Sequence, residues 1–228
     1  MLVLLSAVAC FGPLSFYLIA LGQLHRRIRV TVWSGRTDFL ALLAGLSGFL
    51  LILGVAWLLA AQSNARFLVR GNATQIRAVF DEERNAWALT VVGYLIAMVV
   101  PVALTLYARR SVLAVFNIDW ADLERAIDET TTELGLTTTR FGRVWSDGRD
   151  LVSAEMNWTS HFAAVKLLTH DPRLCQELEL GLRKKLAAVE GPQGAIGLWL
   201  YTAGLTCLGM AAASLLMNFY FVYLLGSN

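Results

Sequence analysis

The chain has 228 residues, a formal net charge of +2 and a hydrophobic content of 57%. Its three cysteines exclude the disulfide framework of a small secreted domain, and its near-balanced charge excludes the strongly basic surface of a nucleic-acid-binding protein. The charged side chains and the first histidine fall into three polar blocks, 25–38, 66–84 and 109–190, and the four segments around these blocks carry no charge.

The four uncharged segments are 1–24, 39–65, 85–108 and 191–228. Each exceeds the roughly 20 apolar residues that a helix needs to cross a bilayer, so the sequence predicts four transmembrane helices. Their spans are about 2–23, 39–61 and 86–107, with the fourth inside 191–228. We expect the first segment to be a retained anchor, because no basic residue precedes its apolar run. In the second span, Ala41, Ala44, Gly45 and Gly48 recur at four-residue spacing, which favours close packing within the bundle.

Arginine and lysine predict the orientation. The first and third polar blocks hold nine of them near the membrane, against four in 66–84, so both blocks are expected in the cytoplasm and both termini outside. The Arg-rich, Ala/Leu/Gly-rich composition favours a bacterial protein of the inner (plasma) membrane. Within 62–86, a helical turn or two is expected to start near Asn72 and lead into the third span.

The 109–190 block predicts a small α+β domain inserted between the third and fourth helices. Residues 112–118 are expected to form a strand, followed by a helix that Asp119 caps and Gly135 ends. Strands at 137–145, 151–158 and 161–169 follow, with a tight turn at Asp147-Gly148. The last helix starts at Asp171 and Pro172. The expected buried stripes of the two helices are Leu123, Ala126, Ile127 and Leu134, and Leu174, Leu178, Leu182 and Leu186.

The expected fold is therefore a membrane α-helical protein with four transmembrane helices and an inserted strand-helix-three strands-helix domain. Its parts are 1–108 with three helices, the soluble domain 109–190, and 191–228 with the fourth helix.

Catalytic motifs are lacking, so we do not expect an enzyme. The sequence contains no glycine-rich phosphate loop, no HExxH, no GxSxG and no CxxC pair. His170, Asp171 and Cys175 lie close together, but Asp171 is explained as a helix cap and His170 has no constrained partner. No metal or other cofactor is predicted.

Two sets of polar residues are candidates for contacts. On the polar face of strand 151–158 and the next strand, Glu155, Asn157 and His161 are candidates for a partner or ligand contact, although a solvated sheet face is the simpler and more common explanation. Basic residues at the ends of the domain are expected to face anionic lipid headgroups, namely Arg109, Arg110, Arg183, Lys184 and Lys185.

The absence of a reaction motif favours a non-catalytic accessory or structural subunit, whose cytoplasmic domain docks on or regulates a larger membrane complex. Its partners would be the lipid bilayer and another membrane protein or further copies of the chain, without nucleic acid. Two alternatives stay open: a transport component that forms a pathway on oligomerisation, and a membrane-anchored ligand sensor whose pocket lies between domain and bilayer.

Overall fold

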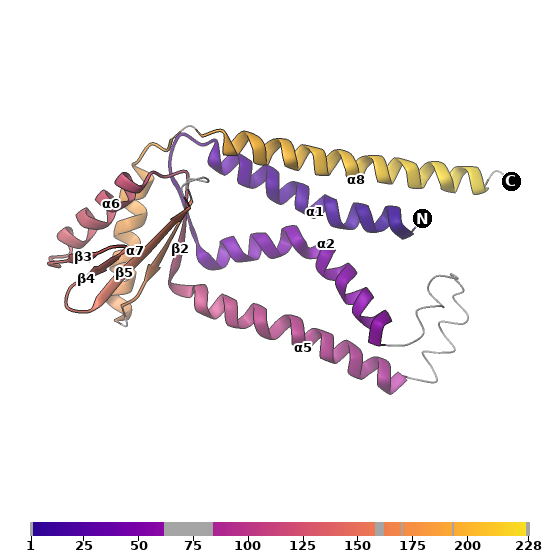
Figure 1. The fold of residues 1–228 in the computed structure, drawn as a ribbon, viewed down its shortest axis with the longest axis horizontal. Helices are drawn as coiled ribbons and strands as arrows, with labels where there is room; N and C mark the ends of the chain where they lie inside the picture. Colours follow the sequence, from indigo (N-terminus) through magenta and orange to yellow (C-terminus); the bar gives the residue numbers. More distant parts are fainter. Residues whose placement is uncertain (1, 62–83, 158–161, 170, 193, 227–228) are drawn as a thin grey trace.

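The computed structural model describes residues 2–61, 84–157, 162–169, 171–192 and 194–226. Four long helices extend from the same side of a small α+β domain, and both chain termini lie at the far end of the helices (Figure 1). The helical turns predicted within 62–83 lie outside the described residues.

The long helices are α1 (Leu2–His25), α2 (Gly35–Ala61), α5 (Arg84–Ala108) and α8 (Ile196–Gly226). Each contains a stretch long and apolar enough to cross a membrane. This confirms, by length and composition, the expectation of four membrane-spanning helices. A helix of about 20 residues without charge forms its backbone hydrogen bonds internally and exposes apolar side chains to the lipid.

The helices form a row rather than a closed bundle. Their main contacts join α8 to α1, α1 to α2, and α2 to α5. Glycines allow the close approaches: a Cβ at Gly48 of α2 would lie 1.8 Å from the carbonyl oxygen of Ala9, and one at Gly22 of α1 would lie 2.8 Å from the backbone nitrogen of Tyr201. The predicted packing role of the small residues in α2 is thus confirmed at Gly48.

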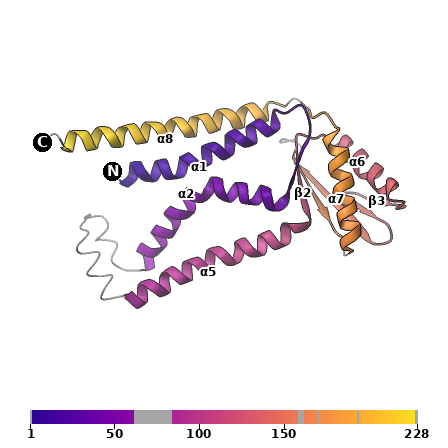
Figure 2. The ribbon, with the colours of Figure 1, turned by 180° about the vertical axis from the view of Figure 1, so that it is seen from behind.

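The domain contains a six-stranded antiparallel sheet with the order β1-β2-β6-β5-β4-β3. The strands are β1 (Thr31–Ser34), β2 (Val112–Phe116), β3 (Thr139–Phe141), β4 (Val144–Ser146), β5 (Asp150–Asn157) and β6 (Phe162–Leu167). A short 3-10 turn, η1 (Arg109–Ser111), joins α5 to β2. Helices α6 (Trp120–Glu133) and α7 (Pro172–Ala187) lie beside each other (Figure 2) and contribute to the same core as one face of the sheet.

The core contains the alternate residues of the strands that point toward the two helices. Val115, Val152, Val165 and Trp145 are fully buried there, together with Leu123 and Ile127 of α6 and Leu178, Leu182 and Leu186 of α7. The predicted stripes of both helices are confirmed, with Leu134 and Leu174 half-buried at the edge of the core. Period-2 alternation in the strands and 3.6-residue spacing in the helices give each element one apolar side.

The ends of both helices agree with the sequence. Asp119 is the N-cap residue of α6, and Gly135, with φ of 72°, follows its C-cap. The amide of Leu136 donates to the carbonyl oxygen of Thr131 at 3.0 Å, the bond that closes a Schellman motif. At α7, the Oδ1 of Asp171 accepts from the amide of Arg173 at 2.9 Å, and Pro172 occupies the first turn.

The predicted strand order is wrong in two respects. First, the sheet gains β1 from the Arg-rich segment between α1 and α2, where only a loop was expected; Val32 pairs with Val115 of β2. Secondly, the strand predicted at 137–145 is two strands, because Gly142 takes φ of 62° at the first central position of a two-residue hairpin. The Asp147-Gly148 turn is present, with φ of 67° at Gly148.

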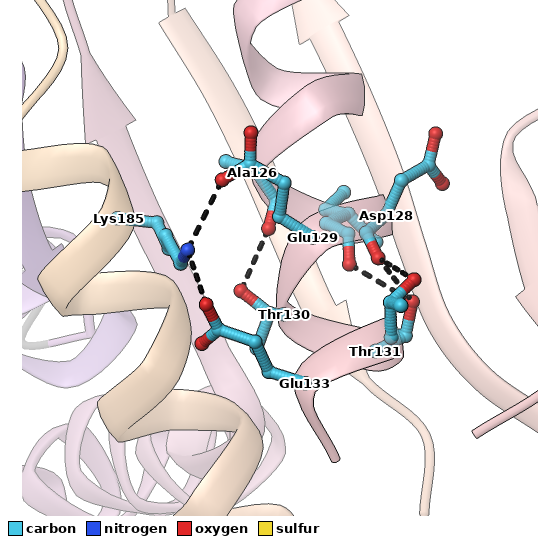
Figure 3. Close-up of polar contacts among 9 residues, drawn as sticks. Ala126, Asp128, Glu129, Thr130, Thr131, Glu133 and Lys185 are labelled. Atoms are coloured by element: carbon cyan, nitrogen blue, oxygen red, sulfur yellow. Dashed lines mark hydrogen bonds and ion pairs between the residues drawn. The ribbon is translucent and has the colours of Figure 1, made fainter. Parts of the chain in front are cut away.

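Helices α6 and α7 are also joined by ion pairs. Lys185 of α7 reaches both Glu129 and Glu133 of α6 (Figure 3), the former at 3.1 Å. Beside it, the hydroxyl of Thr130 donates to the carbonyl oxygen of Ala126 at 2.7 Å, which satisfies a polar group buried between the helices. A Cβ at Gly181 would lie 2.6 Å from the Thr130 methyl carbon, so glycine sets the closest approach of α7 to α6.

Candidate binding site between the helices and the sheet

The last residue of α1, His25, lies where the long helices meet the sheet. Its side chain is buried, with a residue exposure of 4%, and its ring packs edge-to-face on Phe116 of β2 at 5.6 Å between centroids. Nδ1 lies 2.9 Å from the carbonyl oxygen of Leu21. Because a carbonyl oxygen only accepts, Nδ1 donates its hydrogen to Leu21, and in the neutral ring Nε2 keeps a free lone pair.

The Nε2 atom of His25 is buried and has no hydrogen-bond partner among the described residues. Leaving such an atom unpaired costs about 1–3 kcal/mol, which is why buried polar atoms in folded proteins almost always have a partner. A buried imidazole nitrogen with an open lone pair is therefore suited to accept a hydrogen bond from a ligand.

Two cavities share His25 as a wall. The larger, of about 500 Å³, lies between the end of α1 and the segment before α8, and is lined by Arg26, Arg27 and Asn117 on its polar side. The smaller, of about 270 Å³, is mostly apolar. Besides His25 it is lined by the polar Tyr17 and Asp38 and by Leu21, Phe116, Phe162, Ile196 and Leu200. His25 thus stands between a basic and an apolar compartment.

A third cavity continues the apolar compartment between α1 and α2. It has a volume of about 390 Å³ and shares Tyr17 and Leu21 with the cavity described above. Its remaining walls are apolar or small, among them Pro13, Phe16 and Gly45. The three cavities lie one after another along α1. The surroundings of the helix therefore change from apolar near Pro13 to basic at Arg26 and Arg27, and His25 lies where they change.

One ion pair borders the apolar compartment. Nη1 of Arg109, the first residue of η1, donates to Oδ2 of Asp38, in the first turn of α2, at 3.2 Å. The guanidinium of Arg109 also lies over the ring of Phe39, 5.2 Å from its centroid. These contacts join α2 to η1, directly after α5, and balance the two charges. The positive character of the site therefore comes from the cavity lined by Arg26 and Arg27.

The structure describes only part of the predicted contact face on the sheet. Glu155 is exposed on β5, on the face away from the helical core. Asn157 ends β5, but its side chain lies outside the described residues, as does the whole of His161. A partner or ligand contact at these three residues stays a prediction.

The basic residues predicted to meet lipid headgroups occupy several environments. Arg109 pairs with Asp38, the guanidinium of Arg110 lies 4.4 Å from the ring centroid of Tyr107, and Lys184 is exposed on α7. Arg183 donates to Glu179 at 3.0 Å and to the carbonyl oxygen of Val32 at 3.1 Å. Lys185 lies between Glu129 and Glu133. Their contact with lipid also stays a prediction.

Cys175 lies at the start of α7, half-buried. Burial raises the pKa of its thiol, the Glu179 carboxylate raises it further, and Arg110 partly offsets the rise. A thiol of raised pKa is a poor nucleophile at neutral pH. Among the described residues, no group of three or more His, Cys, Asp or Glu side chains is arranged to hold a metal ion.

The site at His25 is absent from the sequence-based expectations. His25 begins a run of basic residues after an apolar segment, a pattern that indicates orientation in the membrane and not a buried ring. The chain matches no family model, no curated protein and no solved structure. Its function is therefore inferred from the chemistry of the site alone.

Proposed function

We propose that the chain is a membrane-anchored ligand-binding subunit, a sensor, which holds an amphiphile with its polar head beside His25 and its apolar part along α1. One observation carries the proposal: His25, whose buried Nε2 has an open lone pair, lines both a basic and an apolar cavity.

The residues of the polar cavity indicate which chemical groups the head of the ligand carries. Nε2 accepts a hydrogen bond, so the head offers a hydroxyl or another donor. Arg26 and Arg27 line the same cavity, so the head also bears negative charge, which guanidinium groups bind by charge-assisted hydrogen bonds. The tail follows from the two apolar cavities at Leu21 and Tyr17, because apolar surface favours an apolar occupant.

Binding there acts directly on the sheet. Phe116 of β2 and Phe162 of β6 form part of the wall, and their rings pack on each other at 5.2 Å. An occupant of the cavity therefore contacts the domain and three of the long helices, α1, α2 and α8, at once. This supports a role in which ligand binding changes the position of the domain relative to the helices.

We place the domain in the cytoplasm at the inner membrane of a bacterium, with both termini outside. Because β1 is paired with β2, the segment between α1 and α2 lies on the same side as the domain. The nine Arg and Lys residues that lie near the membrane in these two blocks support the cytoplasmic side by the positive-inside rule.

Native mass spectrometry of the full chain, purified in a mild detergent, tests the proposal. The wild-type chain should retain an amphiphile. His25→Phe keeps the ring on Phe116 but removes Nε2, so the retained amount should fall about tenfold, the effect of one lost hydrogen bond of about 1.4 kcal/mol. Ile28→Ala, at a position 65% exposed in the same segment, is the matched control and should bind as the wild type does. A wild-type chain without bound amphiphile, or equal retention in His25→Phe, would contradict the proposal.

An accessory role in a larger complex is the second candidate. Phe141 is 72% exposed on β3, which is an edge strand of the sheet, and exposed edges can pair with another chain. A pull-down from membranes compares the wild type with Phe141→Ser and with Glu155→Ala. Loss of the same co-purified protein in Phe141→Ser supports docking at this edge, and unchanged co-purification in both variants counts against it. The apolar walls around Pro13 lend no comparable support to a transport role.

A further inference from the structure

A separate cavity of about 690 Å³ lies on another side of the domain. The start of α2, the turn η1, the end of β6 and the first half of α7 meet there. Its positive side chains are Arg36, Arg110 and Lys166. None of these three residues lines the cavities at His25, so this cavity is independent of the proposed amphiphile site.

The charge of this cavity is unbalanced. Among the residues that the structure describes, Glu179 is the one carboxylate that lines it, and its Oε1 accepts from Nε of Arg183 at 3.0 Å, so its charge is already compensated. Arg36 donates from Nε to the carbonyl oxygen of Leu106 at 3.3 Å, a neutral partner, and Arg110 lies over Tyr107. Three cations from three different elements therefore line one cavity, and none of them forms an ion pair within the described part of the chain; like charges gathered in this way favour a bound anion.

Neutral hydrogen-bond donors complete the wall. The hydroxyls of Ser111 and Thr169 and the amide of Gln176 line the cavity. Oγ1 of Thr169 accepts from the amide of Asp171 at 3.3 Å, so its own hydrogen remains available to donate. The start of α7 adds little, because Asp171 already caps it. The site thus depends on side chains rather than on the helix dipole.

We propose that this cavity binds an organic phosphate, a molecule that joins a phosphate group to a less polar part. Three cations and several neutral donors suit the oxygens of phosphate, which accept many hydrogen bonds at once. The volume lies within the range of small-molecule sites and exceeds what a bare phosphate ion fills, while Leu167, Leu168 and Pro172 provide an apolar wall for the remainder. The phosphate can belong to a lipid headgroup or to a soluble ester.

The thiol of Cys175 is compatible with an anion in the same cavity. Its raised pKa keeps it neutral near pH 7, so it does not repel a phosphate. A phosphate bound here would contact α2, η1, β6 and α7 together and would hold the domain against the ends of two long helices.

Thermal unfolding of the full chain in a neutral detergent at low ionic strength tests this site. The probes are inorganic pyrophosphate for a soluble phosphate and phosphatidylglycerol for a lipid headgroup, with phosphatidylcholine as the zwitterionic comparison. Each probe that binds raises Tm, because a ligand that binds only the folded state stabilises it. A rise with pyrophosphate alone assigns the site to a soluble ester, one with phosphatidylglycerol alone assigns it to a lipid, and one with both assigns it to phosphate as such; all three support the proposal.

The variants decide whether the effect belongs to this cavity. Arg110→Gln and Lys166→Gln should each weaken the apparent Kd of the effective probe about tenfold, as expected for one charge-assisted bond. Gln176→Glu, at an exposed position, should weaken it without removing any cation. Lys184→Gln, exposed on α7 and outside the cavity, is the control and should behave as the wild type does. The proposal is overturned if neither anionic probe raises Tm, or if the three cavity variants respond as the control does.

Discussion

Trp145 offers the sharpest test of how the domain is held together. It is fully buried on β4, and its indole Nε1 donates to Oδ1 of Asp128 on α6 at 2.7 Å. Trp145→Phe removes this donor and part of the ring. The lost bond to a carboxylate is worth about 1.5–3 kcal/mol, and the unfilled volume adds roughly 1 kcal/mol at about 24 cal/mol per Å³. Since Asp128 is on the exposed side of α6, the lower half of the range for the bond, about 1.5–2.2 kcal/mol, applies, and a total of about 2.5–3.2 kcal/mol is expected.

Native-state hydrogen exchange of the full chain measures this loss where it occurs. Amides of β4 and β5 that exchange through opening of the domain should exchange about 60 to 200 times faster in Trp145→Phe, since each 1.4 kcal/mol is a factor of ten. Asp128→Ala keeps the ring but leaves the buried N–H unpaired, at a cost of about 1–3 kcal/mol. Asp128→Asn keeps an acceptor and should cost less. If Trp145→Phe and Asp128→Ala both exchange at the wild-type rate, the bond between β4 and α6 does not stabilise the sheet.

Three further predictions follow from other contacts. Val30 is 5% exposed and belongs to the domain core, so Val30→Ala should destabilise the domain by about 1–3 kcal/mol. Ile28→Ala, at an exposed position, should leave the melting temperature unchanged in the same experiment. Gly48→Ala places a methyl group against α1 and should lower the thermal stability of the helix pair by about 1–3 kcal/mol; an unchanged melt would refute the close packing there. The hydrogen bond from Lys185 holds the pKa of Glu133 below its usual value, so this contact stabilises the fold at a pH above the ordinary carboxylate pKa, and the stabilisation is lost as the pH falls through the lowered pKa of Glu133. Lys185→Gln should therefore lose less stability than the wild type in an acid titration. Identical acid curves for the two proteins would exclude this contribution.

Local sequence features predicted most of the elements. Uncharged runs gave the four long helices, and Asp119, Gly135, Asp171 and Pro172 marked helix ends where the structure has them. These features act within one or two turns of chain, so a single sequence contains them. The two hairpins differ. The Asp-Gly pair at 147–148 predicts a turn, whereas Gly142 has the same tolerance for positive φ but lies inside a segment that the sequence predicts as one strand.

Contacts between distant segments could not be predicted in the same way. Val32 and Trp33 are typical strand residues, but a strand of four residues is defined by its partner, and β2 is far away in the sequence. The site at His25 could not be predicted for the same reason, because it too depends on contacts between distant segments. Its walls come from the end of α1, the start of α8, β2 and β6, and only folding brings these together. In the proposed phosphate cavity, the sequence predicts a lipid-headgroup contact for Arg110, but it does not indicate that Arg36 and Lys166 lie beside it, because these residues come from distant segments.

The pairing of β1 with β2 requires β1 to wait for its partner strand while the chain is synthesised. The ribosome makes β1 before α2, and β2 emerges only after α2 and α5, so at 5–20 residues per second the first strand waits roughly 4 to 16 seconds for its neighbour. During that interval its edge is free to bind other nascent chains. The sheet can therefore be completed only after α2 and α5 have been inserted into the membrane. If one of these helices failed to insert, Thr31–Ser34 and β2 would lie on opposite sides of the bilayer and could not pair.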